Sequence, residues 1–441
     1  MVKVGKIILV SSPFFSQLAP TIALARAFLE KGVKTAIACT EHFRNEIVSK
    51  RIKFIPLAVS RNINTGIALR TRQTREQKRR LNDFLKATKR GAIETLMIQT
   101  RDRQYDMLFD PDKLRSDIQK IHKQESPDLW LINQLSYSVT LALYCLRLPF
   151  VTLCIPHPTT IPDGKKIYGV PAQWPKAFKV NQEKLARLKE AARKVEKEFT
   201  DEFNSKIERC DKKLKPVSRA FSLTSSDLIL YNYPDLSNID DRSASPKKIF
   251  MGYCFEMQQL PEWYKKVIEK SKSRSPKILI VMGTFLSYRN DVIGRCIRAL
   301  KEEYPESLII AAAGASTRKL RRFQSDDVLV EEYVPQKGLL PYMDVVIHHG
   351  GNNSFTESLY FGKPMVIMPF SSDQFDIASD AEELRIAGVL NPNSFGIGSI
   401  KKALRHTLSR ESEKALLYWK QKLATRGPRY AVRRLLSTLS K

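Results

Sequence analysis

The stretch that decides the fold runs from Asp344 to Gln374: DVVIHHGGNNSFTESLYFGKPMVIMPFSSDQ. Its apolar, β-branched run from Val345 to His348 predicts a short buried strand. The glycine turn that follows leads into a helix beginning near Asn353, and a second buried strand is expected from Met365 to Phe370. A strand, a helix and a strand in this order indicate a parallel sheet with helices on its faces.

The turn between the first strand and the helix has the chemistry of an anion site. The first N–H groups of a helix have no intrahelical partner and lie at the positive end of its dipole, and glycines let the backbone approach a phosphate without a Cβ in the way. His349 adds a side-chain donor, while Glu357, one turn into the helix, offers two oxygens suited to a ribose diol. Asp373 and Gln374 follow the second strand and suit a hydroxyl-rich sugar. We therefore predict a site for a diphosphate that links a ribose to a sugar.

Two upstream segments complete this pattern. The sequence YVPQ spans Tyr333 to Gln336, and the apolar run from Lys277 to Met282 is followed by Gly283-Thr284. In their order and spacing, these segments resemble the signature of nucleotide-sugar-dependent glycosyltransferases of the UDP-glycosyltransferase type. That family includes plant enzymes and bacterial natural-product and macrolide glycosyltransferases.

The resemblance implies a donor site that takes a UDP-sugar or a dTDP-sugar. The residues expected to bind the donor are Thr284 at the phosphates, Tyr333 and Gln336 at the step that holds the base, His349, Gly351, Asn353 and Ser354 at the diphosphate, Glu357 at the ribose, and Asp373 and Gln374 at the transferred sugar. The sugar is expected to be a hexose, with glucose first. Each piece also has a structural alternative, because paired glycines are common before helices and a histidine can belong to a core. Asn352 departs from the bulky residue that is usual at its position.

Composition indicates a globular protein of two or three domains, because 441 residues with 43% hydrophobic content can bury sizeable cores. No apolar run reaches the about 18 residues of a membrane span, and the N-terminal apolar segment predicts a first strand better than a signal peptide. Six scattered cysteines without a C-x-x-C pair favour reduced thiols in a cytoplasm. The one D-x-D, Asp110-Pro111-Asp112, is expected to be a helix cap or turn, so neither a metal nor a cofactor is predicted.

The net charge of +28 concentrates in two segments of the N-terminal half. Residues 61–103 hold twelve Lys or Arg against four Asp or Glu, and residues 176–219 hold fourteen against eight. The second segment contains apolar residues at helical spacing between 181 and 215, which predict an amphipathic helix with a solvated, ion-paired face. For the first segment, attraction of an anionic ligand or peripheral contact with the inner face of an anionic membrane stays open. Nucleic acid is not expected, since no recognition motif accompanies the charge.

Two alternating series of strands and helices predict two doubly wound domains. Strands are expected near residues 6–10, 34–39, 129–132 and 150–155, and then near 278–281, 308–311, 328–330, 345–348 and 365–368. The glycines of a phosphate loop or a dinucleotide fold are missing after the first strand. The resemblance implies the α/β GT-B architecture, with two facing Rossmann-like domains. We expect an acceptor domain at 1–240, a donor domain at 249–410, and a C-terminal helix within 411–441 that crosses back to the first domain.

The acceptor side departs from the resembled family. The family carries His-x-x-Pro after the first strand, where the histidine takes the acceptor's proton and a later aspartate orients it. Here the segment is Gln17-Leu18-Ala19-Pro20, and Asn133 stands at the best match to the aspartate. An amide cannot accept a proton at physiological pH. We therefore expect inverting transfer to a small-molecule or lipid-like acceptor whose nucleophile carries its own activation, such as an anion or an amine, positioned by Gln17 and Asn133.

Three alternatives stay open at this point. His157 follows the strand that ends near residue 155 and is a candidate substitute base, although a histidine between prolines is more often structural. A chain that kept the donor site and lost the dyad would be a non-catalytic nucleotide-sugar-binding partner. A nucleotide-sugar epimerase with the same architecture is the third alternative.

Overall fold

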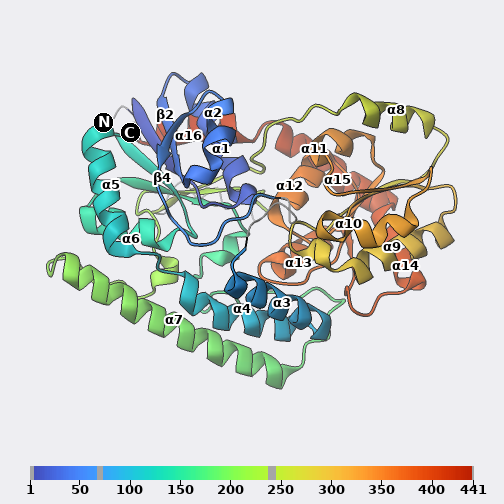
Figure 1. Cartoon of the computed structure of the whole chain (residues 1–441), viewed down its shortest axis with the longest axis horizontal. Helices are drawn as coiled ribbons and strands as arrows, with labels where there is room; N and C mark the ends of the chain where they lie inside the picture. The colour runs from blue at the N-terminus through green and yellow to red at the C-terminus, as the bar shows by residue number, and fades with distance from the viewer. Residues whose placement is uncertain (1–3, 67–72, 237–244, 440–441) are drawn as a thin grey trace.

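The computed structural model describes residues 4–66, 73–236 and 245–439, and it contains two α/β domains that lie side by side (Figure 1). The predicted boundary between residues 240 and 249 falls partly on residues 237–244, which lie outside the described residues. Each domain is built on a parallel sheet with helices on its faces, which is the arrangement that the alternating strands and helices predict.

The first sheet has the strand order β3-β2-β1-β4-β5-β6-β7 within the described residues. Its central strands are apolar on both faces, as strands covered by helices on both sides must be. The strands are β1 (Lys6–Val10), β2 (Lys34–Cys39), β3 (Lys53–Pro56), β4 (Leu129–Asn133), β5 (Phe150–Cys154), β6 (Leu228–Tyr231) and β7 (Lys247–Phe250). The helices between them are α1 (Phe15–Glu30), α2 (Arg44–Ser49), α3 (Arg75–Arg90), α4 (Ala92–Asp106), α5 (Pro111–Glu125), α6 (Tyr137–Leu146) and α7 (Gln182–Cys210).

The second sheet has the order β10-β9-β8-β11-β12-β13 within the same described part of the chain. Its strands are β8 (Lys277–Val281), β9 (Leu308–Ala312), β10 (Val328–Glu331), β11 (Val345–His348), β12 (Met365–Ile367) and β13 (Ala387–Val389). Its helices are α8 (Glu262–Lys270), α9 (Asn290–Glu303), α10 (Thr317–Leu320), α11 (Gln336–Leu339), α12 (Asn352–Tyr360), α13 (Gln374–Glu383) and α14 (Ile397–Thr407), followed by α15 (Arg410–Ala424) and α16 (Pro428–Leu439).

The chain leaves the first domain later than the sequence indicated. Ile249, expected to open the second domain, lies on β7 at the edge of the first sheet and pairs with Leu230 of β6. Its side chain is buried in the first domain's core, where α1 and α16 also pack. Tertiary packing decides which sheet this four-residue strand joins, and its own sequence does not indicate it.

Only the last helix crosses back to the first domain. α15, which begins inside the predicted returning segment, packs instead on α12 of the second domain, where Trp419 joins the core around Phe355. α16 does return, because Val432 and Leu435 are buried against α1 and β7. Figure 1 shows α16 close to α1 and β2, with both chain ends at the first domain.

A layer of three helices, α3, α4 and α7, packs together on one side of the molecule (Figure 1), and α3 carries seven Lys or Arg against two Asp or Glu. α7 confirms the predicted amphipathic helix, since its apolar positions from Leu185 to Ile207 are buried and Arg187 and Lys197 pair with carboxylates four residues away. Within the described residues, no helix is both long and apolar enough to cross a membrane.

The order of each sheet reverses at one place, between β1 and β4 in the first domain and between β8 and β11 in the second. In doubly wound folds, ligands bind outside the carboxyl ends of the strands at this switch point. The loops after β1, β4, β8 and β11 should therefore border a common site.

Candidate functional site

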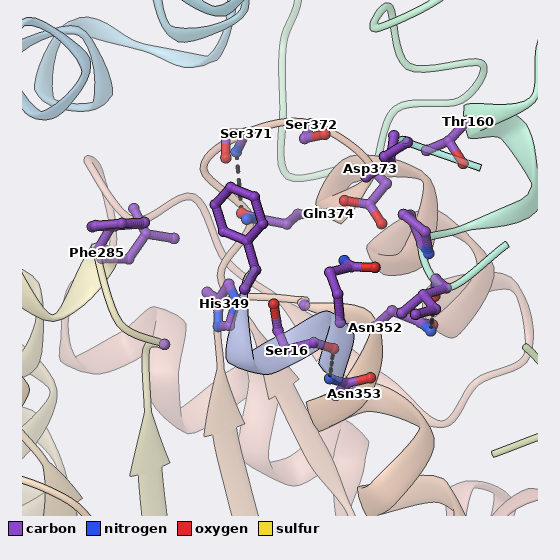
Figure 2. Close-up of a pocket in the computed structure, with 18 of the residues that line it drawn as sticks. Ser16, Thr160, Phe285, His349, Asn352, Asn353, Ser371, Ser372, Asp373 and Gln374 are labelled. Atoms are coloured by element: carbon purple, nitrogen blue, oxygen red, sulfur yellow. Dashed lines mark hydrogen bonds between the residues drawn. The ribbon is translucent and has the colours of Figure 1, made fainter. Parts of the chain in front are cut away.

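A cleft of about 680 Å³ lies where the loops of both switch points meet. The first domain contributes the start of α1 and the loop after β5, and the second contributes the loops after β8, β11 and β12. Figure 2 shows Ser16, Phe285, His349 and Asn353 around this space, with Asp373 and Gln374 at its far side. A smaller cavity of about 200 Å³ shares several of these residues and extends toward Tyr333 and Glu357.

His349 follows β11 and is held between two glycine loops. A Cβ on Gly351 would lie 2.5 Å from His349 Nε2, and one on Gly283 would lie 2.9 Å from its Cε1, so both positions need glycine for the ring to fit. Burial lowers the pKa of His349 to about 4. The ring is therefore neutral at pH 7 and can donate one N–H to an anion in the cleft without carrying a charge of its own.

The N-terminus of α12 also opens into the cleft. Gly351 precedes the helix in an extended conformation, so the N–H groups of the first helical residues are not used within the helix. Gly351, Asn353 and Ser354 all line the cleft. Asn353 Nδ2 donates to Ser16 O across the domain boundary at 2.8 Å, as Figure 2 shows, and Ser354 Oγ accepts from Gln336 Nε2 at 3.3 Å.

Asn352, the departure from the usual bulky residue, ties the two domains together. Its side chain is buried, and Nδ2 donates to Ile155 O at 2.5 Å and to Asn232 O at 2.6 Å. Both carbonyls follow strands of the first sheet. A bulky apolar residue here would leave them without this donor, so the amide serves the contact between α12 and the first domain.

Glu357 and Tyr333 border the smaller cavity, with Thr284 at its junction with the main cleft. Gln336 Nε2 donates to Glu357 Oε2 at 2.8 Å, and burial raises the pKa of Glu357 to about 7. The Tyr333 side chain is 50% exposed, which leaves its ring face open to stack on a flat ligand. Thr284 Oγ1 donates to Gly66 O of the first domain at 3.0 Å.

Asp373 and Gln374 lie together at the far side of the cleft, between the end of β12 and α13. Gln374 Oε1 accepts from the backbone N–H groups of Phe370 and Ser371 at 2.9 and 3.1 Å, which fixes the direction of its amide. Its Nε2 group is then the part available to a hydroxyl. Burial raises the pKa of Asp373, whose Oδ2 accepts from the backbone N–H of His157 at 3.0 Å.

Gln17 and Asn133, which lie far apart in the sequence, are in direct contact. Asn133 Nδ2 donates to Gln17 Oε1 at 2.6 Å, and Asn133 Oδ1 accepts from the backbone N–H of Leu135 at 2.9 Å. A backbone N–H can only donate, so this bond fixes the direction of the Asn133 amide and, through it, that of Gln17. Gln17 lines the cleft, where its Nε2 amide group can donate to a ligand.

The structure does not place His157 where a substitute base would have to stand. Its ring is buried outside the cleft lining, with Nε2 bonded to Asp380 Oδ2 at 2.9 Å and Nδ1 in contact with Thr159 Oγ1 at 2.7 Å. Burial alone would lower the pKa of His157, but the bond to Asp380 and the nearby charge of Asp376 outweigh it and raise the pKa. Because both ring nitrogens are engaged and the ring lies outside the cleft lining, this geometry does not support His157 as a base, and its contacts join the two domains.

Sequence reasoning did not find the partners of His157. Asp376 and Asp380 are four residues apart on α13, so they share one helix face toward the first domain. Asp376 accepts from the backbone N–H groups of Ala172 and Gln173 at 2.8 and 2.9 Å. The available signal was two carboxylates at helical spacing, Asp376 and Asp380, among the apolar residues of α13.

Two facing α/β domains of parallel strands, with one cleft at both switch points, define the class: this is a GT-B fold. The fold resembles that of the glycosyltransferase VinC solved in complex with dTDP, with a TM-score of 0.64 at 15% identity over 98% of this chain and 99% of that one.

Sequence comparisons find likenesses to one family of enzymes. Residues 242–423 match the family described as UDP-glucoronosyl and UDP-glucosyl transferase. The NDP-glycosyltransferase YjiC of Bacillus subtilis (strain 168) is 21% identical over 398 residues, which cover 90% of this chain and 87% of that protein. The uncharacterized UDP-glucosyltransferase YdhE of the same organism is 33% identical over 131 residues, which cover 30% of this chain and only 33% of YdhE. The family match covers less than half of the chain, and together these likenesses support a UDP-glycosyltransferase-like protein with the GT-B fold and a transferase of the nucleotide-sugar type.

Proposed function

We propose that this chain transfers a hexose, with glucose as the first candidate, from a UDP-sugar or dTDP-sugar to a small-molecule or lipid-like acceptor, with inversion. The observation that carries the proposal is that one cleft is bordered by the N-terminus of α12 and His349 from one domain and by Gln17 from the other. A diphosphate on the first wall and a nucleophile on the second would approach the anomeric carbon from opposite sides. Holding both reactants in this way removes much of the entropic barrier.

The donor wall would stabilise the leaving group. Charge develops on the diphosphate oxygen as the bond to the sugar breaks, and the N–H groups at the start of α12, with the neutral ring of His349 beside them, would donate to it. A preorganised donor of this kind is worth about 10²- to 10³-fold in rate. Glu357 and Tyr333 would hold the ribose and base, and Asp373 and Gln374 the sugar hydroxyls.

The acceptor wall would select the nucleophile. A general base contributes about 10²- to 10⁴-fold to the transfer of a proton from a hydroxyl, and Gln17 cannot supply it. Because Asn133 Nδ2 donates to Gln17 Oε1, the Gln17 amide is oriented so that its N–H donors are available to the cleft, and neither amide can take up a proton. We therefore propose a nucleophile that is ionised or has a free lone pair, oriented by Gln17 and indirectly by Asn133.

Incubation of the purified chain with UDP-sugars, dTDP-sugars and a cell extract tests the proposal. Mass spectrometry should find an acceptor that gains one hexose. A His349→Ala variant should lose about 10²-fold in rate, while the matched His406→Ala variant, at an exposed position on α14, should not. Binding of UDP without turnover would instead identify a non-catalytic partner protein, and an isomerised donor sugar would identify an epimerase.

A further inference from the structure

The first domain's wall of the cleft holds an arginine that the donor and acceptor roles above do not use. Arg103 of α4 lines the cleft together with Gln99, one turn earlier on the same helix. Among the described residues, Arg103 Nη1 and Gln99 Oε1 are buried without a hydrogen-bond partner. A buried donor on a charged group is costly to leave unsatisfied, so a bound group that accepts from it is expected.

The residues around Arg103 hold its guanidinium in place. Its Cζ lies 4.8 Å from the centroid of the buried Tyr168 ring, which packs edge-on against Tyr137. Gly169 has a φ of +76°, and a Cβ there would lie 1.4 Å from Arg103 Nη1. The glycine therefore provides the space that the guanidinium occupies, and the aromatic ring fixes its plane.

Two described carboxylates, one beside this arginine in the sequence and one in the cleft lining, have other partners. Asp102 pairs with Arg101 at 2.9 Å. Asp376 accepts from Thr159 Oγ1 at 2.8 Å and from two backbone N–H groups of the first domain. The positive charge of Arg103 is thus left for a ligand, and a planar guanidinium matches a carboxylate in geometry and charge.

On the basis of the proposed function, we infer that Arg103 binds the carboxylate of the acceptor and that the acceptor is an apolar carboxylic acid. Apolar side chains of the same cleft, Phe15, Phe84 and Phe285 among them, suit the body of such a molecule. A carboxylate is also a nucleophile that needs no base, which fits the amide at Gln17. Gln99 can turn its amide to donate to the same group.

The transfer to a carboxylate needs no proton acceptor. One carboxylate oxygen forms a bond to the anomeric carbon, and the bond from that carbon to the diphosphate oxygen breaks. The nucleoside diphosphate leaves with the electron pair, so the negative charge moves from the acceptor to the leaving group. The product is an ester of the sugar.

A binding experiment on the full chain tests the site independently of turnover. We expect 2-naphthoate to bind the UDP-saturated protein more tightly than 2-naphthalenemethanol, by calorimetry. Arg103→Met should weaken naphthoate binding about 10- to 100-fold and leave the alcohol unchanged, with Arg103→Lys in between. The control is Arg101→Met, because Arg101 is half-exposed on the same helix and lies outside the cleft. Equal naphthoate affinity in the Arg103→Met and Arg101→Met proteins would overturn the inference.

A transfer experiment tests the chemistry. With UDP-glucose and naphthoate, the product should be a hexose ester that neutral hydroxylamine cleaves, and a hydroxylamine-resistant product would overturn the inference. If Arg103→Met weakened the use of UDP-glucuronate as donor but not the use of naphthoate, the arginine would bind a carboxylate of the donor. That result would also overturn the inference. Transfer to other acceptors, with acid binding that does not depend on Arg103, would overturn this inference and leave the proposed function intact. Acid binding without any sugar transfer would overturn the proposed function.

Discussion

At the residue scale, the pair formed by Gln17 and Asn133 replaces a titrating dyad with two groups that do not titrate. With a His–Asp pair, the rate would rise with pH as the histidine loses its proton and becomes able to act as a base. Two amides, locked by the N–H of Leu135, leave the acceptor as the group whose ionisation matters on this wall of the cleft. The pH dependence of transfer should therefore follow the chemistry of the acceptor.

Restoring the dyad should change which acceptors react. The double change Gln17→His and Asn133→Asp puts a proton acceptor into the same contact, so transfer to a neutral alcohol should gain about 10²- to 10⁴-fold. Rates with 2-naphthalenemethanol should also rise with pH around 6.5, the ordinary pKa of histidine. The single Asn133→Asp variant keeps Gln17 and should show no gain. A wild-type protein that already uses the alcohol as well as the double variant does would contradict the proposed selection of the nucleophile.

Glu357 should make nucleotide binding depend on pH. Burial raises its pKa to about 7, and a ribose diol donates best to the ionised form. Affinity for UDP should therefore decline as the pH falls below about 7, by at most about tenfold for each pH unit. In Glu357→Gln, UDP should bind more weakly and with no such slope, as calorimetry between pH 5.5 and 8 can measure. A Glu357→Gln protein with the wild-type slope would exclude the ribose role.

At the element scale, local pattern explains what could be predicted from the sequence and what could not. β11 and α12 were predictable because a β-branched run, a glycine turn and a helix are each specified by neighbouring residues. The fate of α15 and α16 was not, because both are amphipathic and only tertiary packing decides which domain buries each apolar face. β7 was missed for the same reason, since its four residues join the first sheet only through their pairing with β6.

The candidate site divides in a similar way. Residues on the switch-point loops, such as His349 and Gln17, could be found because short motifs mark them. Arg103 could not, because arginines and a carboxylate alternate from Arg101 to Arg103, which is the pattern of a solvated helix face. Its burial depends on Tyr168 and Gly169, which are distant in the sequence.

Asn352 gives a prediction at the level of one element, the attachment of α12. In Asn352→Leu, the carbonyls of Ile155 and Asn232 lose a buried donor, so the free energy of unfolding should fall by about 2 to 4 kcal/mol. Thermal unfolding measures the loss, and hydrogen exchange should show faster exchange in α12. The matched comparison is Asn352→Asp, which removes the donor but keeps the shape and should destabilise as well. Unchanged stability in both variants would show that the hydrogen bonds of Asn352 do not stabilise the fold.

At the scale of the whole molecule, polar contacts between the domains surround the cleft. Arg289, almost fully buried in the second domain, donates to Thr88 Oγ1 of α3 at 3.2 Å, and Asn393 Nδ2 donates to Thr88 O at 2.8 Å. Phe375 of α13 packs among apolar residues of α4 and α7. The helices α3, α4 and α7 are thus fastened to the second domain, and residues of α3 and α4 line one side of the cleft.

His157 should make this closed arrangement sensitive to pH. Asp380 Oδ2 accepts from both His157 Nε2 and the hydroxyl of Tyr233, so the ring joins the loop after β5 to α13. Because the pKa of His157 is raised in the folded state, the protonated ring stabilises the fold below its ordinary value of about 6.5, and this contribution is lost as the pH rises through the raised value.

The thermal midpoint of the wild-type protein should therefore fall, relative to that of His157→Gln, as the pH is raised from about 6 to 9. Asp380→Asn should remove the same pH-dependent difference, since it takes away the partner that holds the proton. The pH–rate profile of His157→Gln should keep the wild-type shape, because the ring lies outside the cleft lining. A difference in thermal midpoint that stays constant at all pH values would show that the ring does not titrate in the folded protein. A flattened pH–rate profile in His157→Gln would show that His157 acts as a base in the reaction.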